Sequence, residues 1–265
     1  KSVKGYSLPK TADSNSLIIT TSVSGETQET LEVLKKAIET NSKVIAFSSG
    51  GSMKKICQDN DIFFQEIPMI HSPRGSFAKF LFSILSILKD VFSINESDIE
   101  EAILNLEKTR ERISSRNLGK DNVALELAEW INDTPLVYYP NGLQSAAIRF
   151  KNSLQENSKK HVITEEVLES CHNGIVAWEK NSNVQPIFIR GIDDHEKTIE
   201  RWNILEQFFN EEKIKFFEIT SIDGNIISKI VNLIYLLDYS SIYHSILKKI
   251  DPSPVRSIDF VKAKL

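Results

Sequence analysis

Short apolar runs alternate along the chain with segments in which apolar residues recur every three or four positions. The runs have the length of buried strands and lie beside Gly, Pro, Ser or Asn residues, which favour turns. They are Leu17–Thr21, Lys43–Phe47, Leu136–Tyr139, Pro186–Ile189 and Phe216–Ile219. Strands that alternate with helices usually form a parallel sheet flanked by helices. The pattern therefore predicts an α/β fold, with each parallel sheet in an αβα sandwich.

Helical spacing is clearest in two segments. One apolar stripe lies in residues 29–40, and a second lies in residues 143–154, made of Leu143, Ala146, Ala147, Phe150 and Leu154. The charged segment Ser97–Asn117 also has a helical pattern but no strand of its own. It predicts a helix that connects two α/β halves. We therefore expect two domains, residues 1–118, ending in this connector, and residues 119–265.

The most hydrophobic stretch is 77–92, FAKFLFSILSILKDVF, which contains Lys79 and Lys89. A membrane span needs about 20 largely uncharged residues. We expect a buried helix instead, partly in a subunit interface. The first ten residues, KSVKGYSLPK, lack the apolar core of a secretory signal.

Composition narrows the class of protein. The 265 residues carry a net charge of −4 with both signs mixed throughout, which favours neither nucleic acid nor a membrane surface as partner. Cys57 and Cys171 are too few and too isolated for a disulfide framework or a zinc cluster, and the histidines show no paired ligand spacing. We expect reduced thiols, a cytoplasmic location and no metal site.

A hydroxyl-rich turn follows the first predicted strand. In SVSGETQET (22–30), the hydroxyls of Ser22, Ser24, Thr27 and Thr30 surround Gly25 where a helix begins. A helix N-terminus presents unpaired N–H groups and a partial positive charge, and short hydroxyls add donors. Phosphate would suit such a turn. Alternatively, Ser24 or Thr27 only caps the helix, with a nearby glutamate completing a capping box.

A second turn of the same kind, SSGG (48–51), follows the next strand. In a parallel sheet the carboxyl ends of neighbouring strands meet at one edge, where ligands bind. The two turns should converge there, which favours a small ligand that carries a phosphate. The sequence contains no Walker lysine pattern and no GxGxxG, so a nucleotide is disfavoured.

Five stretches resemble one family, in its order and over nearly the whole chain. SVSGETQET is similar to the S-x-S-G-x-T-x-E-T signature of sugar isomerase (SIS) domains. HSPRGSFAKFL, AAIRFKNSLQENSKK, LESCHNGIVAW and the ending LLDYSSIYHSILKKIDPSPVRSIDFVKAKL resemble segments of the bifunctional phosphoglucose/phosphomannose isomerases. The resemblance implies two tandem SIS domains of flavodoxin-like type in a homodimer with shared active sites. It implies no cofactor and a phosphorylated hexose as substrate.

The same resemblance implies roles for individual residues. Ser22, Ser24 and Thr27 would hold the sugar phosphate, and Arg74 would stabilise negative charge on an enediolate. An arginine suits that task because it is always protonated.

Three residues of the second half complete the implied site. Glu156 would move a proton between C1 and C2, His172 would open the sugar ring from the neighbouring subunit, and Lys262 would also face the site. One carboxylate can act as both acid and base in such a transfer, and a histidine can exchange protons near neutral pH.

Each of these residues also has an ordinary interpretation. Glu156 lies about 220° around its helix from the apolar Leu143, which predicts a side chain in solvent. Alone, His172 would be a structural or surface histidine, Arg74 a loop arginine in an ion pair, and Lys262 a solvated lysine near a chain end. The site assignment therefore depends on the joint match of the motifs.

The sequence departs from the family pattern in two ways. Members usually begin with a further strand and a glycine-rich turn, so either this sequence is a fragment or the protein has lost that segment. Glu26 also stands where Asn is usual. We expect a metal-independent isomerase that interconverts glucose 6-phosphate or mannose 6-phosphate with fructose 6-phosphate through a cis-enediol. The alternatives are a non-catalytic phosphosugar-binding regulator and an SIS isomerase of another phosphosugar.

Overall fold

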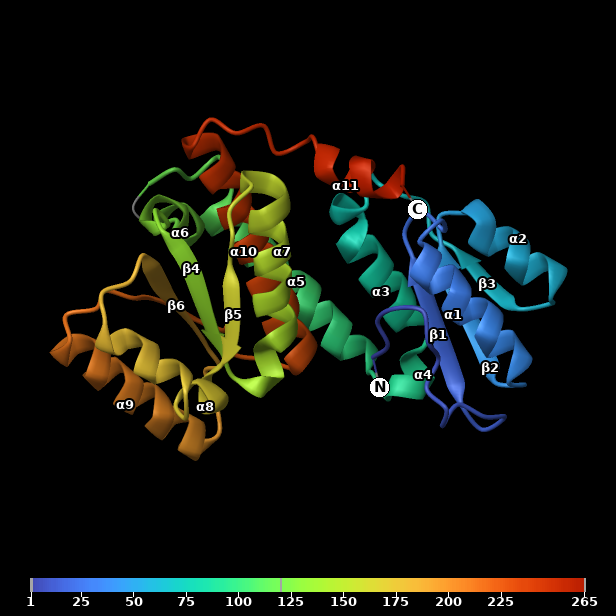
Figure 1. Ribbon diagram of the computed structural model, residues 1–265, viewed down its shortest axis with the longest axis horizontal. Coiled ribbons are helices and arrows are strands. Elements are labelled where there is room, and N and C mark those ends of the chain that lie inside the picture. Colours follow the sequence, from blue (N-terminus) through green and yellow to red (C-terminus); the bar gives the residue numbers. More distant parts are fainter. Residues whose placement is uncertain (1, 120, 265) are drawn as a thin grey trace. The chain divides into compact units, whose positions relative to one another are not determined.

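The computed structural model describes residues 2–119 and 121–264. The chain divides into two compact units, Lys1–Ile94 and Asn95–Leu265. Each unit contains its own parallel sheet flanked by helices, so the predicted α/β fold is confirmed (Figure 1).

The sheet of the first unit has the order β1-β2-β3, with all neighbours parallel. Its strands are β1 (Leu17–Ser22), β2 (Lys43–Ser48) and β3 (Phe63–Glu66). Ser22 lies opposite Ser48 in the register. Strands β1 and β2 therefore end at the same edge of the sheet, and the turns that follow them begin side by side.

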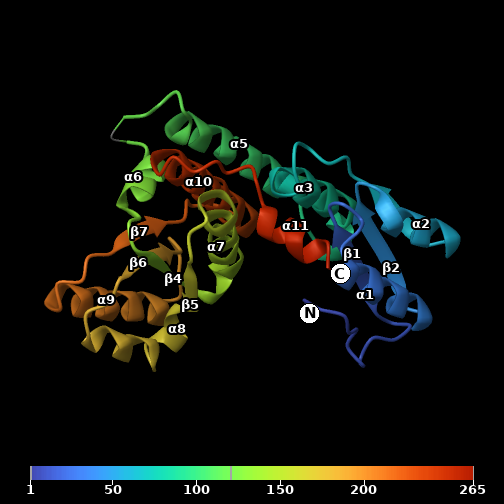
Figure 2. The ribbon, with the colours of Figure 1, turned by 45° about the horizontal axis from the view of Figure 1, so that its top comes forward.

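Helices cover both faces of this first sheet (Figure 2). On one face, α1 (Gln28–Glu39) and α2 (Gly51–Asp59) pack against β2 through a buried cluster that includes Leu34, Ala46 and Met53. On the other face, Phe47 of β2 packs against Phe80 of α3 (Phe77–Ile87). Successive strand residues point to opposite faces, so β2 supplies both layers.

The hydrophobic stretch 77–92 forms two helices, α3 and the short α4 (Lys89–Phe92), rather than the expected single helix. Phe80 and Leu88 are buried, whereas Val91 and Phe92 are about half exposed. The second part is therefore not buried within this chain, and its burial in a subunit interface stays a prediction. Within the described residues, no helix combines the length and the apolarity that a membrane crossing requires.

The sheet of the second unit has the order β5-β4-β6-β7 and is also parallel. Its strands are β4 (Thr134–Tyr139), β5 (Ile163–Glu166), β6 (Val184–Arg190) and β7 (Phe217–Thr220). The apolar runs predicted β4, β6 and β7 to within two residues at either end. The short edge strands β3 and β5 were not predicted.

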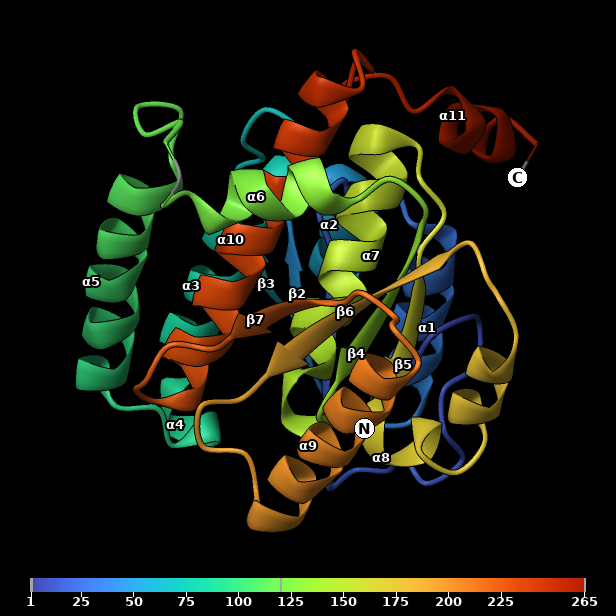
Figure 3. The same cartoon turned by 90° about the vertical axis from the view of Figure 1, so that its left-hand side faces the viewer.

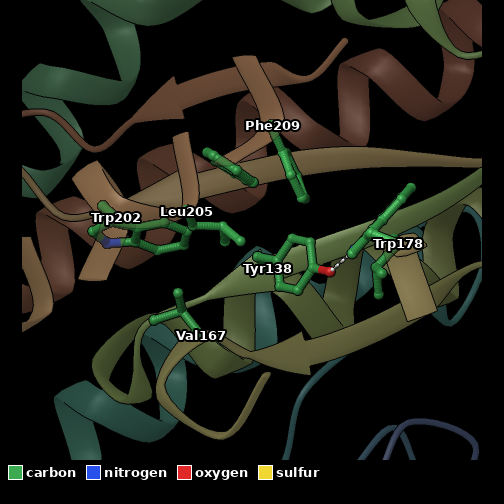
Figure 4. Close-up of a cluster of buried hydrophobic side chains, with 8 residues drawn as sticks. Tyr138, Val167, Trp178, Trp202, Leu205 and Phe209 are labelled. Atoms are coloured by element: carbon green, nitrogen blue, oxygen red, sulfur yellow. Dashed lines mark hydrogen bonds between the residues drawn. The ribbon is translucent and has the colours of Figure 1, made fainter. Parts of the chain in front are cut away.

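An aromatic cluster fills one face of the second sheet (Figure 4). Tyr138 of β4 and Phe188 of β6 pack against Trp202 and Phe209 of α9 (Glu196–Glu211). Trp178, in the 3₁₀ helix η3 (Gly174–Glu179), donates a hydrogen bond of 2.9 Å from Nε1 to the Tyr138 hydroxyl. The polar tips of both rings are thus satisfied inside the cluster. Helix α8 (Val167–Ser170) borders it.

The other face carries α7 (Gln144–Ser158), which packs on β4 and β5 and on the long helix α10 (Ile226–Leu247). Figure 3 shows α10 running between α7 and α5 (Glu96–Ile113), with α6 (Val123–Trp130) across it. An extended segment then leads from α10 to α11 (Arg256–Lys262) at the C-terminal end. The 3₁₀ helices η1 (Arg74–Ser76) and η2 (Asn141–Leu143) precede α3 and α7.

The connector helix α5 belongs to the second compact unit, whereas its charged pattern predicts that it ends the first domain, residues 1–118. Polar bonds fix it to α10. Asn232 Nδ2 donates to Thr109 Oγ1 (2.6 Å), and the Tyr243 hydroxyl donates to the Ile113 carbonyl (2.6 Å). These partners lie over 100 positions apart, so the sequence pattern of α5 alone does not identify them.

A buried histidine should make the second unit sensitive to acid. His244 on α10 is 1% exposed, and its Nε2 lies 3.2 Å from the Ile131 carbonyl. Burial lowers the pKa of His244, and Lys248 and Lys160 lower it further, although the Ile131 contact raises it. The folded state therefore disfavours protonation of His244. The free energy of unfolding keeps its full value above the unfolded-state pKa of about 6.5 and decreases as the pH drops below that pKa.

We expect the free energy of unfolding to fall below pH 6.5 by up to about 1.4 kcal/mol per pH unit from this group. Urea unfolding at pH 8, 7, 6 and 5.5 would measure the slope. His244→Leu should be less stable at pH 8, because Ile131 loses its partner, but its stability should change less between pH 7 and 5.5. An unchanged slope in the variant would contradict this role.

Candidate functional site

The first hydroxyl turn forms a closed network at the end of β1. Ser22 is buried, and its Oγ lies 2.8 Å from Thr27 Oγ1 and accepts a hydrogen bond of 3.1 Å from the Gly25 amide. Ser24 Oγ accepts from the Glu26 amide (3.2 Å). Ser24 and Thr27 are exposed. The turn thus presents the hydroxyls of Ser24 and Thr27 to solvent, while the Ser22 hydroxyl is buried.

Thr27 is the N-cap residue of α1, but its side chain accepts no capping hydrogen bond. The Thr27 hydroxyl faces Ser22 instead. The capping interpretation of the hydroxyls is therefore wrong for Thr27. Without that cap, the first amide groups of α1 stay available for an anion, which a helix N-terminus attracts.

The second turn locks against the first. Ser49 donates from its amide and from its hydroxyl to the Val23 carbonyl, at 3.0 and 2.7 Å. The Met53 amide, in the first turn of α2, donates to the Gly25 carbonyl (3.0 Å). The predicted convergence of the two turns is thus confirmed. Their backbones form one rigid surface at the carboxyl edge of the sheet.

Glu26 joins the two turns through its side chain. Its carboxylate accepts hydrogen bonds from the Ser52 amide (2.6 Å) and the Ser52 hydroxyl (2.8 Å), at the first turn of α2. A carboxylate is favourable there because of the helix dipole. The positive end of α2 is therefore occupied by the chain's own anion. The negative charge of Glu26 is thus compensated by hydrogen bonds within the two turns.

Gly25 is required by the contact between the turns. Its φ is +73°, and a Cβ at this position would lie 2.0 Å from the Gly50 carbonyl oxygen. Gly25→Ala should therefore lower the free energy of unfolding by at least about 1–3 kcal/mol, the range for a strained backbone position. Urea denaturation would measure the loss.

Gly142→Ala is the matched control, because nothing lies within 4 Å of the added Cβ and its φ is not positive. This control should stay within about 0.5 kcal/mol of the parent, as ordinary surface substitutions do. Equal losses in the two variants would contradict the proposed contact between the turns.

Arg74 begins η1 in the loop before α3, and its side chain is half-buried. The buried Ser76 organises this loop. Its hydroxyl accepts from the Ile70 amide (2.8 Å) and lies within hydrogen-bond distance of the Ile70 and Ser72 carbonyls. The Gly75 amide donates to Ser72 Oγ (3.2 Å). Arg74 is thus carried by a loop with a fixed backbone.

Glu156 lies on the last turn of α7 and is half-buried rather than in open solvent. It lines a cavity of about 570 Å³ within the second unit, together with residues from 254 to 258 of the C-terminal segment. The solvent position predicted from the helical wheel is therefore wrong. A segment almost 100 residues further along the chain covers this side of α7.

A polar seam holds α7 against α10. Arg149 donates to the Asp238 carboxylate from Nε (3.2 and 3.3 Å) and Nη2 (2.8 Å), and Ser153 Oγ donates to the same carboxylate. One turn further, Asn157 Nδ2 donates to Ser241 Oγ (2.8 Å). Arg149, Ser153 and Asn157 are spaced by four, so they share one face of α7. The seam fixes the helix that carries Glu156.

These seam residues were missed by the sequence analysis, although they belong to its motifs. Arg149 and Asn157 lie in the stretch RFKNSLQENSKK, and Asp238 begins DYSS. The available signal was the polar spacing of four within the apolar stripe of α7. It indicates side chains that must find polar partners on a neighbouring helix.

His172 and Lys262 are exposed, and neither lines the cavity beside Glu156. His172 follows α8 in a turn closed by a hydrogen bond from its amide to the Glu169 carbonyl (3.0 Å). Lys262 ends α11. In β5, burial raises the pKa of Glu165, and the Glu169 charge raises it further. The roles of His172 and Lys262 stay predictions.

The described residues offer no grouping of three or more His, Cys, Asp or Glu side chains suited to a metal ion. Burial raises the pKa of the Cys57 thiol to about 11, in the core between α1, α2 and the sheet. Cys57 therefore serves as an apolar core residue rather than a reactive thiol.

The chain is similar in sequence to a known family and to enzymes of two organisms. The sequence family described as the bacterial phospho-glucose isomerase C-terminal SIS domain matches residues 120–265. The bifunctional phosphoglucose/phosphomannose isomerase of Caldicellulosiruptor bescii is 31% identical over 99% of this chain and 80% of that protein. The enzyme of the same name from Aquifex aeolicus is 26% identical over the same shares.

Among solved structures, the chain is similar to the tagatose-6-phosphate ketose/aldose isomerase of Escherichia coli. The TM-score is 0.70 at 12% sequence identity, covering 90% of this chain and 71% of that one. At this identity the similarity supports the fold alone. The sequence matches, in contrast, cover nearly the whole chain.

Proposed function

Because the chain belongs to the family of bifunctional phosphoglucose/phosphomannose isomerases, we propose that it is an aldose–ketose isomerase of phosphorylated hexoses. Its substrates would be glucose 6-phosphate or mannose 6-phosphate, each interconverted with fructose 6-phosphate. The two aldoses differ only at C2 and share one enediol, so a single site can serve both. We place the reaction in the cytoplasm and the active enzyme in a homodimer.

The phosphate would bind at the hydroxyl turn of the first unit. Ser22, Ser24 and Thr27 supply hydroxyls there, and the N-cap side chain leaves the first amides of α1 available. The equivalent end of α2 already holds the Glu26 carboxylate. The anion is therefore expected at α1 rather than at α2.

The proton transfer would use Glu156 as base. Its carboxylate would take the proton from C2 of the open-chain aldose, and the electron pair of that C–H bond would form the enediolate. Return of the proton to C1 gives the ketose. Arg74 would stabilise the negative oxygen, His172 of a second subunit would open the ring, and Lys262 would also face the sugar. A positioned base contributes about 10²–10⁴-fold to such a step.

The observation that most supports this proposal is the half-burial of Glu156 beside a cavity of about 570 Å³. A cavity of several hundred Å³ has the size of a small-molecule site. A carboxylate within it can be shielded from bulk water when a sugar is bound, as an acid–base group requires.

A coupled assay that starts from fructose 6-phosphate would test the proposal. Separate reporter enzymes for glucose 6-phosphate and mannose 6-phosphate should both detect product, and other ketose phosphates should react more slowly. Binding of fructose 6-phosphate without turnover would identify a regulator instead. If a different phosphosugar were isomerised faster, that sugar would be the substrate, and the protein would still be an aldose–ketose isomerase.

A further inference from the structure

A lysine at the end of α7 donates a hydrogen bond to the C-terminal arm, defined as residues 251–262, beside Glu156. Lys159 is the C-cap residue of α7, and its Nζ donates to the carbonyls of Glu156 (2.5 Å) and Pro254 (2.8 Å). One ammonium group thus bridges the end of α7 and the start of the arm. Both carbonyls belong to residues that line the cavity.

The backbone of Lys159 is left-handed, with a φ of +56°. Glycine is the usual residue at such a position after a helix, because it has no Cβ to strain. A lysine here accepts that strain. The two hydrogen bonds of its side chain explain why lysine rather than glycine stands at position 159. A glycine there would leave the Pro254 carbonyl without this donor.

The arm has little other burial to hold it. No residue of α11 is buried, and Phe260 and Val261 are more than half exposed. Within the arm, Asp251 accepts a hydrogen bond from the Ser253 amide (2.8 Å), which stiffens the turn before Pro254. That bond and the Lys159 charge lower the pKa of Asp251. Few apolar contacts and exposed backbone are the features of a segment that opens locally.

We infer that Lys159 is a positioning residue, which holds the C-terminal arm beside the cavity next to Glu156 and so keeps that carboxylate half-buried. This role rests on the proposed function, in which Glu156 is the base. Lys159 acts through the backbone of the arm and not on the sugar. The arm also carries Lys262, so its position sets the position of that side chain.

The test compares Lys159→Met, which keeps the length of the side chain but removes its donor, with the parent. We expect amide hydrogen exchange in residues 250–264 to accelerate by at least about tenfold, because charged hydrogen bonds of this kind hold local structure. Exchange elsewhere should not change. The kcat for fructose 6-phosphate should fall about tenfold, with a smaller change in KM. Lys159→Arg, which restores a charged donor, should recover most of both.

Lys213→Met is the matched control. Lys213 has a φ of +58° just after α9 and is exposed, so it shares the backbone strain but not the bridge. It should leave exchange and kcat unchanged. Glu156→Gln should remove activity while the arm stays protected. Parent-like exchange of residues 250–264 in Lys159→Met would overturn the inference. If the parent protein were inactive but exchange of the arm still accelerated in Lys159→Met, the proposed function would be overturned. The positioning of the arm by Lys159 would still hold.

Discussion

Glu156→Gln should lower kcat for fructose 6-phosphate by at least about 10²-fold, because the amide cannot accept the proton that the carboxylate would take. The substitution keeps the size of the side chain, and Glu156 is half-buried at the edge of the cavity, so the fold should persist. KM should change little, since the substitution leaves the hydroxyl turn that would bind the phosphate unaltered. A coupled assay on purified protein measures both constants.

Glu129→Gln provides the control for this experiment. Glu129 is an exposed residue near the end of α6, and the same chemical change there should leave kcat unaffected. Circular dichroism and a melting curve would show that both variants fold. Equal rates in Glu156→Gln and the parent would rule out Glu156 as the base.

Asp238→Ala should reduce the stability of the second unit by about 2–3 kcal/mol. The Asp238 carboxylate accepts from Arg149 and Ser153, and the side chains of Arg149 and Asp238 are only 21% and 29% exposed. Hydrogen bonds to charged groups contribute about 1.5–3 kcal/mol each, and exposure reduces that value. Urea unfolding followed by tryptophan fluorescence would measure the loss.

Two further variants sharpen this result. Asp238→Asn keeps the shape and one acceptor but removes the charge, so it should lose about half as much stability as Asp238→Ala. Asp133→Ala removes an exposed carboxylate in the same unit and should lie within about 0.5 kcal/mol of the parent. If Asp238→Ala behaved like Asp133→Ala, the seam would not be what holds α7 to α10.

The fold could be predicted where the residues of a single strand or helix show a clear apolar pattern. The central strands β2, β4 and β6 read as apolar runs because both of their faces are buried. The edge strands β3 (FFQE) and β5 (ITEE) were missed because their second halves are polar, so neither contains an apolar run of strand length. Their pairing comes from the neighbouring strand and not from their own pattern.

The hydroxyl turns could also be predicted, because a strand, a turn and a helix start are local features. Parallel strands that end in register then bring Ser22 and Ser48 together. The burial of Glu156 could not be predicted in the same way. Helical periodicity describes one helix, whereas the segment that lines the cavity together with Glu156 begins at Pro254.

The unit boundary differs from the prediction for a similar reason. The pattern of α5 is that of a charged, solvent-exposed connector. Helix α5 is part of the second unit because Asn105, Thr109 and Ile113 form hydrogen bonds to α10, more than 120 positions away. Asn105 and Thr109 are spaced by four and so share one face of α5, but this spacing does not identify α10 as the partner.

Proton exchange with solvent tests the central claim most directly, because it reports the base rather than the overall rate. Fructose 6-phosphate would be incubated with the enzyme in D₂O, and deuterium at C2 of the aldose product and at C1 of the ketose would be followed by NMR. The parent should incorporate deuterium at both carbons, and Glu156→Gln should do so at least about 10²-fold more slowly. Equal incorporation by the two proteins would contradict the account.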